Sequence, residues 1–88
     1  MADGFECSLV TPEQALFEGT VTYANLPAHD GQLGVQKGHA PLLVQLGTGE
    51  LDMTLPGGAH RKFDLSGGFA QVLNDRLTLL SESATERE

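Results

Sequence analysis

The sequence has few of the residues on which several classes of site and fold depend. In 88 residues it contains one cysteine, no tryptophan and five basic residues against twelve acidic ones. The single cysteine, Cys7, cannot form an internal disulfide, which suits a reducing compartment, and in an apolar segment we expect it to be a small buried hydrophobe. No apolar run approaches the ~20 residues of a membrane-spanning helix. These absences favour one soluble domain over residues 1–88.

The shortage of basic residues also limits the choice of partners. The net charge is −7, and Arg61 and Lys62 are the only adjacent basic pair. A nucleic-acid-binding protein needs a cationic surface to neutralise phosphates, so we expect no nucleic-acid partner. The acidic residues are spread along the chain, which is typical of a solvated surface. Charge alone does not decide between simple solvation and a basic protein partner.

Apolar residues alternate with polar ones in several short runs, as in β-strands with one face buried. This pattern occurs in Phe5–Val10, Glu50–Leu55, Lys62–Leu65 and Arg76–Leu80, and Val21–Leu26 is a further candidate. The residues that the alternation predicts to be in the core are Leu51, Met53, Phe63, Leu65, Phe69, Leu77 and Leu79.

Turn-forming residues separate these runs. Pro56-Gly57-Gly58 predicts a hairpin, Asn74-Asp75 predicts a two-residue primed turn, and Gly67-Gly68 is expected to separate two strands. Turns at such short intervals indicate an all-β sandwich or barrel of about eight to ten short strands.

Helix is indicated at two places only. Thr11-Pro12-Glu13-Gln14 and Ser83-Ala84-Thr85-Glu86 both have the spacing of a capping box. Neither is followed by enough residues for a stable helix. We therefore expect no helix longer than about two turns, and we expect residues 82–88 to be a short frayed tail.

No pattern of an enzyme, a nucleotide site or a metal site is present in the sequence. There is no phosphate-binding glycine loop, and His29, His39 and His60 are too scattered for a zinc site. No pair of carboxylates has a spacing that suggests acid–base catalysis. We expect no catalytic activity, no metal and no cofactor.

One segment, Gly31–Leu43, stands out because it holds three glycines and a proline within an apolar stretch. Glycines in such a position allow tight corners and close approach of another backbone. A corner of the sandwich or a contact with another protein explains them equally well. A corner does not explain why His39 lies between Gly38 and Ala40-Pro41.

This segment resembles the epsilon subunit family of F-type ATP synthases, which has a Gly-x-Leu-Gly turn followed by Gly-His-Ala-Pro-Leu-Leu. Leu65-Ser66-Gly67-Gly68-Phe69 is similar to a second motif of that family. The opening strand through Val10–Gln14 into Phe17-Glu18-Gly19, and the strand Leu77–Leu80, also look like the family. The resemblance covers about residues 5–84, and the two motifs occur in the family's order and spacing.

The resemblance implies a flattened antiparallel β-sandwich at the foot of the central rotor stalk. The subunit would be non-catalytic and would bind the gamma subunit and the c-ring, peripheral to the membrane on its cytoplasmic, matrix or stromal face. By position, the residues implied to meet the c-ring are Asp30, Gly31, Gln32 and His39. Those implied to meet gamma are Ala40, Pro41, Leu42 and Leu43.

The sequence departs from the resemblance at one point, and, besides a generic sandwich adaptor, one alternative stays open. Many epsilon subunits continue into a two-helix hairpin, which residues up to Glu88 do not include, so we expect no ATP sensing from these residues. The alternative is a lipoyl- or biotinyl-type carrier domain, a small acidic β-sandwich modified on a hairpin lysine. Lys37 would be that lysine, but Gln36 and Gly38 are not its typical neighbours.

Overall fold

The structure is a computed structural model that describes residues 4–87, and these residues form eight β-strands and no helix. This confirms the predicted all-β fold. The strands, in chain order, are β1 (Phe5–Val10), β2 (Ala15–Val21), β3 (Tyr23–Ala28), β4 (Gly31–Val35), β5 (Leu42–Gln45), β6 (Thr48–Thr54), β7 (His60–Val72) and β8 (Arg76–Arg87).

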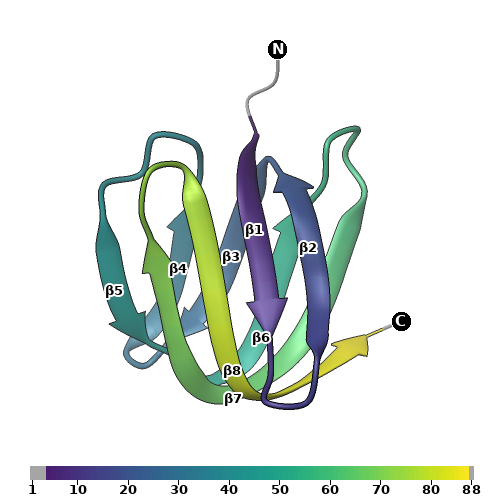
Figure 1. The fold of residues 1–88 in the computed structure, drawn as a ribbon, viewed down its shortest axis with the longest axis vertical. Coiled ribbons are helices and arrows are strands. Elements are labelled where there is room, and N and C mark those ends of the chain that lie inside the picture. Colours follow the sequence, from purple (N-terminus) through teal and green to yellow (C-terminus); the bar gives the residue numbers. More distant parts are fainter. Residues whose placement is uncertain (1–3, 88) are drawn as a thin grey trace.

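The eight strands form one sheet that folds over into two layers (Figure 1). The strand order is β2-β1-β8-β7-β6-β3-β4, and β5 pairs with β7 beside this path. Residues 60–66 of β7 pair with β6, whereas residues 69–72 pair with β5. The front layer therefore holds β5, β1, β2 and the adjoining halves of β7 and β8. The back layer holds β6, β3, β4 and the other halves of β7 and β8. All pairs are antiparallel except β1 with β8, which is parallel.

The two long strands pass from one layer to the other at Gly67-Gly68. Both glycines have positive φ, 71° and 108°, a conformation that other residues adopt only with strain. The expectation that this pair separates two strands is wrong, because β8 accompanies β7 through the bend with Ser66 opposite Ser83 and Gly68 opposite Ser81. The glycines bend a single strand.

Two turns form where the sequence predicts them. Asn74 and Asp75 have φ of 52° and 57°, and the amides of Leu73 and Arg76 each donate to the other's carbonyl, at 3.0 and 3.1 Å. These are the features of the primed hairpin turn expected between β7 and β8. Pro56-Gly57-Gly58 likewise connects β6 to β7.

The core lies between the two layers. Its sixteen buried members are Phe5, Cys7, Leu9, Val21, Ala24, Leu26, Val35, Leu46, Leu51, Met53, Phe63, Leu65, Ala70, Val72, Leu77 and Leu79. Six of the seven predicted core residues are among them, and so is Cys7.

The seventh, Phe69, is 54% exposed, so its prediction is wrong. The reason is the bend. In β7 the inward positions are Phe63 and Leu65 before the glycines and Ala70 and Val72 after them, so the alternation shifts by one residue. Phe69 therefore points out of the sandwich.

The segments with helix-like spacing adopt other structures. Thr11–Gln14 is a tight connection between β1 and β2, in which the Thr11 amide donates to the Gln14 carbonyl at 2.9 Å. The candidate strand over residues 21–26 is divided at Thr22, where β2 ends and β3 begins.

The expected frayed tail is strand up to Arg87, and residue 88 lies outside the described residues. Residues 83–87 pair with β7, with Lys62 opposite Arg87. Glu86 accepts hydrogen bonds from Nε and Nη2 of Arg61, the second at 3.0 Å. The Arg61 guanidinium lies 5.3 Å from the ring centroid of Phe17 in β2 and 5.6 Å from that of Phe63 in β7. These contacts hold the tail and join the two layers.

Candidate protein-binding surfaces

The structure does not bring the four residues implied to meet the c-ring together. Asp30 and Gly31 form the exposed turn between β3 and β4, and Gln32 is exposed at the start of β4. His39 follows the other end of β4, so about 16 Å of extended strand separates it from this turn. Figure 1 shows the β3–β4 turn and the β4–β5 connection at opposite ends of the sandwich.

The β3–β4 turn is attached to the junction between β5 and β6. The His29 amide donates to the Gln45 carbonyl at 2.7 Å, and the Gly47 amide donates to the Pro27 carbonyl at 2.8 Å. Asp30 therefore directly follows a backbone segment, residues 27–29, that is hydrogen-bonded to this junction. This gives the turn a fixed, acidic tip.

The β4–β5 connection begins with a turn over Gln36–His39. The His39 amide donates to the Gln36 carbonyl at 3.1 Å, and Gly38 has a φ of 85°, as in a type II turn. The Gly38 amide donates to Oδ1 of Asp75 at 2.8 Å. His39 is half-buried, and its Nδ1 donates to the Ala40 carbonyl at 2.7 Å.

The residues implied to meet gamma point in different directions. Ala40 and Pro41 are exposed. Leu42 is partly buried and packs against the core, whereas Leu43 is 69% exposed on the outer face of the front layer. Of the two leucines, Leu43 is the one that a partner can reach.

Leu43 belongs to an apolar outer face that sequence reasoning missed. We call this surface the front face and define it by Leu43, Phe69, Leu80 and Val10. Phe69 lies opposite Leu80 in the β7–β8 ladder, and Leu80 lies opposite Val10 in the β8–β1 ladder. Leu43 and Gln45 of β5 face outward next to Gln71 and Phe69. Phe69 and Leu80 are both 54% exposed.

The sequence carried a signal for part of this face. Two consecutive leucines, Leu79-Leu80, cannot both point inward from one strand, so one of them had to be exposed. The location of Phe69 beside Leu80 depends on the shift at the glycine bend, which the local sequence does not reveal.

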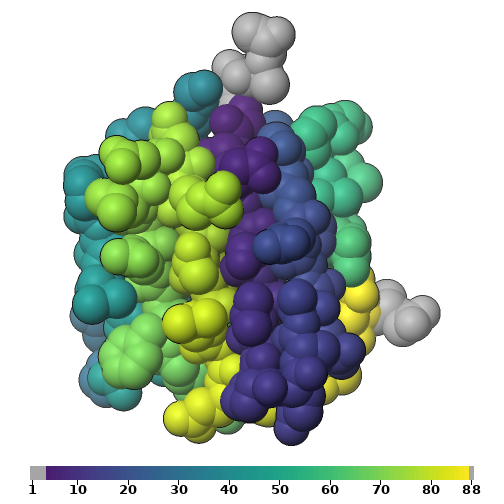
Figure 2. Space-filling model, in the orientation of Figure 1, coloured from purple at the N-terminus to yellow at the C-terminus, as the bar shows by residue number. Residues whose placement is uncertain are grey.

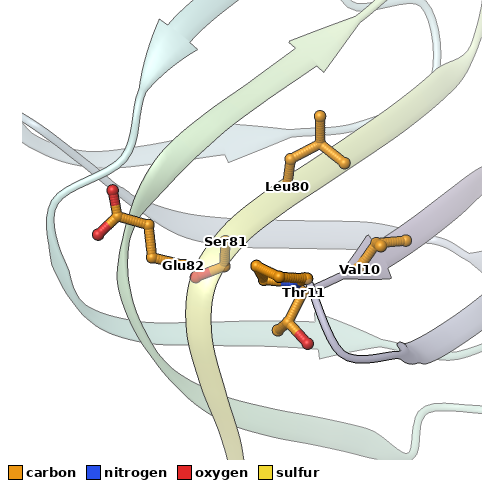
Figure 3. A pocket seen from close by; sticks show the side chains of 6 residues that line it. Val10, Thr11, Leu80, Ser81 and Glu82 are labelled. Carbon is orange, nitrogen blue, oxygen red and sulfur yellow. The ribbon is translucent and has the colours of Figure 1, made fainter.

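The front face continues into an open depression of about 340 Å³ where β8 bends beneath the β1–β2 turn. It is lined by Val10, Thr11, Pro12, Leu80, Ser81 and Glu82. Figure 3 shows that the labelled side chains come from the end of β1, the turn after it and β8. The lining is almost entirely apolar, so the depression suits an apolar side chain of a partner.

Figure 2 views the front layer from this side, with β7, β8, β1 and β2 next to one another.

The outer face of β6, β7 and β8 in the back layer is different, because it carries charged residues that pair with one another. Arg87 donates to Glu50 at 2.7 Å and lies 3.6 Å from Asp64. Nδ1 of His60 donates to Asp52 at 2.8 Å. The front face is thus apolar, whereas the outer face of β6, β7 and β8 in the back layer is ionic.

The described residues offer no arrangement for catalysis or metal binding. Within residues 4–87, no three His, Cys, Asp or Glu side chains gather as metal ligands would. Burial raises the pKa of the Cys7 thiol to about 12, so it stays protonated and unreactive. Residues 4–87 contain no helix that is long and apolar enough to cross a membrane.

Lys37 does not occupy the position that a carrier domain requires. It is exposed in the β4–β5 connection, but β4 pairs with β3 and β5 pairs with β7. Lys37 is therefore not at the tip of a hairpin between two paired neighbours. No observation favours the carrier alternative.

The fold is a small sandwich with apolar side chains on one outer face and an acidic turn, and comparison with known proteins identifies its family. The family described as "ATP synthase, Delta/Epsilon chain, beta-sandwich domain" matches residues 4–87. The chain belongs to this family, which confirms the resemblance. It is 40% identical over 88 residues to the ATP synthase epsilon chain of Koribacter versatilis, covering all of this chain and 61% of that protein. It is 36% identical over 81 residues to the epsilon chain of Chlorobium limicola, covering 92% of each.

Solved structures share the fold. A chain in the mitochondrial ATP synthase of Euglena gracilis, in an assembly of OSCP, F1 and c-ring, superposes with a TM-score of 0.89 at 24% identity. That match covers 98% of this chain and 55% of the other. A chain in the central stalk and c-ring of the Tetrahymena thermophila enzyme gives a TM-score of 0.74 at 18% identity, covering 91% and 64%. The present chain spans about three-fifths of the length of several relatives that it matches, including that of Koribacter versatilis.

Proposed function

We propose that this chain is a non-catalytic central-stalk domain of an F-type ATP synthase, which binds the gamma subunit with its front face and the c-ring with its β3–β4 turn. Through these contacts it would help to couple ion translocation to ATP synthesis. It would lie peripheral to the membrane, on the cytoplasmic side or its matrix or stromal equivalent. Membership of the epsilon family supports this function.

The observation that carries the proposal is the exposure of the front face. Leu43, Phe69 and Leu80 are all more than half exposed, and they continue into an apolar depression. Large apolar surfaces that remain open on a free domain commonly mark protein-binding sites. The outer face of β6, β7 and β8 in the back layer instead carries ion pairs.

The two partners would meet the sandwich at different places. Asp30, Gly31 and Gln32 form the acidic turn that we assign to the c-ring, where cationic loops would complement Asp30 and the net charge of −7. His39 lies at the other end of β4, so we assign it with Ala40, Pro41 and Leu43 to the gamma side. Leu42, the neighbour of Leu43 in β5, is partly buried and packs against the core.

Binding to gamma is tested with purified gamma subunit and variants on each face. Leu80→Asp and Leu43→Asp should each weaken capture at least about tenfold, because each buries a charge in an apolar contact. Ser66→Asp is the matched control, since it adds the same charge on an exposed position of β7 in the back layer. Unchanged thermal unfolding would show that the variants fold. Folded Leu80→Asp and Leu43→Asp variants that bind gamma normally would refute the front face as the site.

Binding to the c-ring is tested separately with detergent-solubilised ring. Asp30→Lys should weaken capture by the ring and leave capture by gamma unchanged, whereas Leu80→Asp should do the reverse. Raised salt should weaken the ring contact more than the gamma contact, since the first is electrostatic. If either variant lost both capture by the ring and capture by gamma, the proposal of two separate binding surfaces would be contradicted.

A further inference from the structure

Asp75 connects three segments that are far apart in the sequence. Its carboxylate oxygen Oδ1 accepts a hydrogen bond from the Gly38 amide at 2.8 Å. Its backbone carbonyl accepts one from the Glu6 amide at 3.1 Å, at the start of β1. Asp75 itself lies in the turn between β7 and β8. One residue thus joins the β4–β5 connection to β1 and to the turn between β7 and β8.

The β4–β5 connection has few other attachments. Within the turn, the His39 amide donates to the Gln36 carbonyl. Lys37 and Gly38 are exposed, and a Cβ placed on Gly38 would have no atom within 4 Å. Among the described residues, the bond from Gly38 to Asp75 is the only hydrogen bond between residues 36–41 and the rest of the sandwich.

The turn does not need an aspartate at this position. Two-residue turns of type I′ have positive φ at both central residues and favour glycine at the second, as in Asn-Gly. Here Asn74 is followed by Asp75 with a φ of 57°. Glycine would adopt that φ without strain. A glycine at this position would form the same turn, so what the Asp75 side chain adds is the hydrogen bond to Gly38.

We propose that Asp75 is a positioning residue, which holds the β4–β5 connection so that His39, Ala40 and Pro41 extend the front face for binding gamma. This inference rests on the proposed function. The bond fixes the segment that leads into β5 and therefore the approach to Leu43. A free connection would have to be ordered at each binding event, at a cost in affinity.

The first test measures the bond itself by hydrogen exchange of the Gly38 amide in three variants of the chain. Asp75→Gly keeps the positive φ and removes the acceptor. Asn74→Gly removes the neighbouring side chain of the same turn and keeps the acceptor. Asp75→Asn keeps an oxygen that can accept. We expect the Gly38 amide to exchange about tenfold faster in Asp75→Gly than in the wild type. In the other two variants its exchange rate should change little.

The second test measures capture of the same variants by purified gamma subunit. Asp75→Gly should weaken binding about fivefold, as expected for loss of one ordering hydrogen bond, while its melting temperature stays equal or rises. Asn74→Gly should bind normally, and Asp75→Asn should restore most of the affinity. A merely structural role would instead lower binding and stability together.

The outcomes separate the two proposals. If the wild-type chain binds gamma and Asp75→Gly binds equally well, the positioning role is refuted and the proposed function stands. If Gly38 exchange is the same in Asp75→Gly as in the wild type, the positioning role is refuted as well. If the wild-type chain does not bind gamma, the proposed function fails, and the positioning role for docking fails with it.

Discussion

Gly68 of β7 lies so close to Leu80 of β8 that a Cβ on Gly68 would overlap the carbonyl oxygen of Leu80. The same carbon would also lie 2.8 Å from Cα of Ser81. The two backbones touch where the sheet folds from one layer to the other. The side of β7 that faces the core changes at this contact, from Phe63 and Leu65 before it to Ala70 and Val72 after it.

We expect Gly68→Ala to lower the free energy of unfolding by at least about 3 kcal/mol, because it combines an unfavourable φ with a backbone clash. Gly57→Ala is the control. Gly57 has a similar φ of 97° but open space around its Cβ position, so we expect a loss of about 1–2 kcal/mol. Urea unfolding measures both. Equal losses would show that the contact with Leu80 is unimportant.

The two faces of β7 predict a contrast between Leu65 and Phe69. Leu65 is 2% exposed, so Leu65→Ala should cost about 2–5 kcal/mol through lost burial and a cavity. Phe69 is exposed, so Phe69→Ala should change stability by no more than about 0.5 kcal/mol while weakening capture by gamma. Chemical denaturation gives the two values, and a large loss in Phe69→Ala would contradict the outward orientation.

The Arg61–Glu86 pair predicts a pH-dependent contribution to stability. The hydrogen bond from Arg61 lowers the pKa of Glu86 in the folded state. This contribution is therefore present above the ordinary glutamate pKa of about 4.3 and is lost as the pH falls through the lower folded value. Wild type should melt higher than Glu86→Gln at pH 7, and the difference should disappear in acid. Raised salt should also reduce it, because both side chains are partly exposed.

Glu82→Gln is the control for this prediction. Glu82 is exposed on the same strand and has no ion-pair partner among the residues that the structure describes. We expect its melting temperature to follow that of the wild type at every pH. A Glu86→Gln variant that behaves in the same way would refute the contribution of the pair.

Cys7 should react with thiol reagents only when the sandwich opens. Its side chain is 2% exposed, its thiol lies 3.6 Å from the sulfur of Met53, and burial raises its pKa to about 12. Labelling should be negligible in buffer at pH 8 and complete in urea. Fast labelling of the folded chain would place Cys7 outside the core.

The sequence predicted the parts of the fold that depend on local chemistry. Asn74-Asp75 forms the expected turn because both residues tolerate positive φ. Leu51, Met53, Leu77 and Leu79 are buried as expected, since each lies in a strand with uninterrupted alternation. Phe69 differs because the alternation passes through a glycine pair whose φ values depend on contacts with β8.

The candidate surfaces were predictable only in part. Asp30 and Leu43 were named from motif position, and both are exposed. The separation of His39 from Asp30 depends on β4 running between them, and the proximity of Val10, Leu80 and Phe69 depends on pairing between distant strands. The pairing of residues 83–87 with β7 was missed because charged residues with helix-like spacing gave no sign of their partner strand.

The parallel pairing of β1 with β8 has a consequence for how the protein is made. Glu6 pairs with Arg76 and Val10 pairs with Leu80, so the first strand has its second neighbour only after the eighth has been synthesised. The β1–β2 hairpin is local and can form early, but one edge of the apolar strand β1 then stays open. At translation rates of roughly 5–20 residues per second, the nascent chain carries this open edge for several seconds. During that time it is a candidate for chaperone binding or for pairing with another nascent chain.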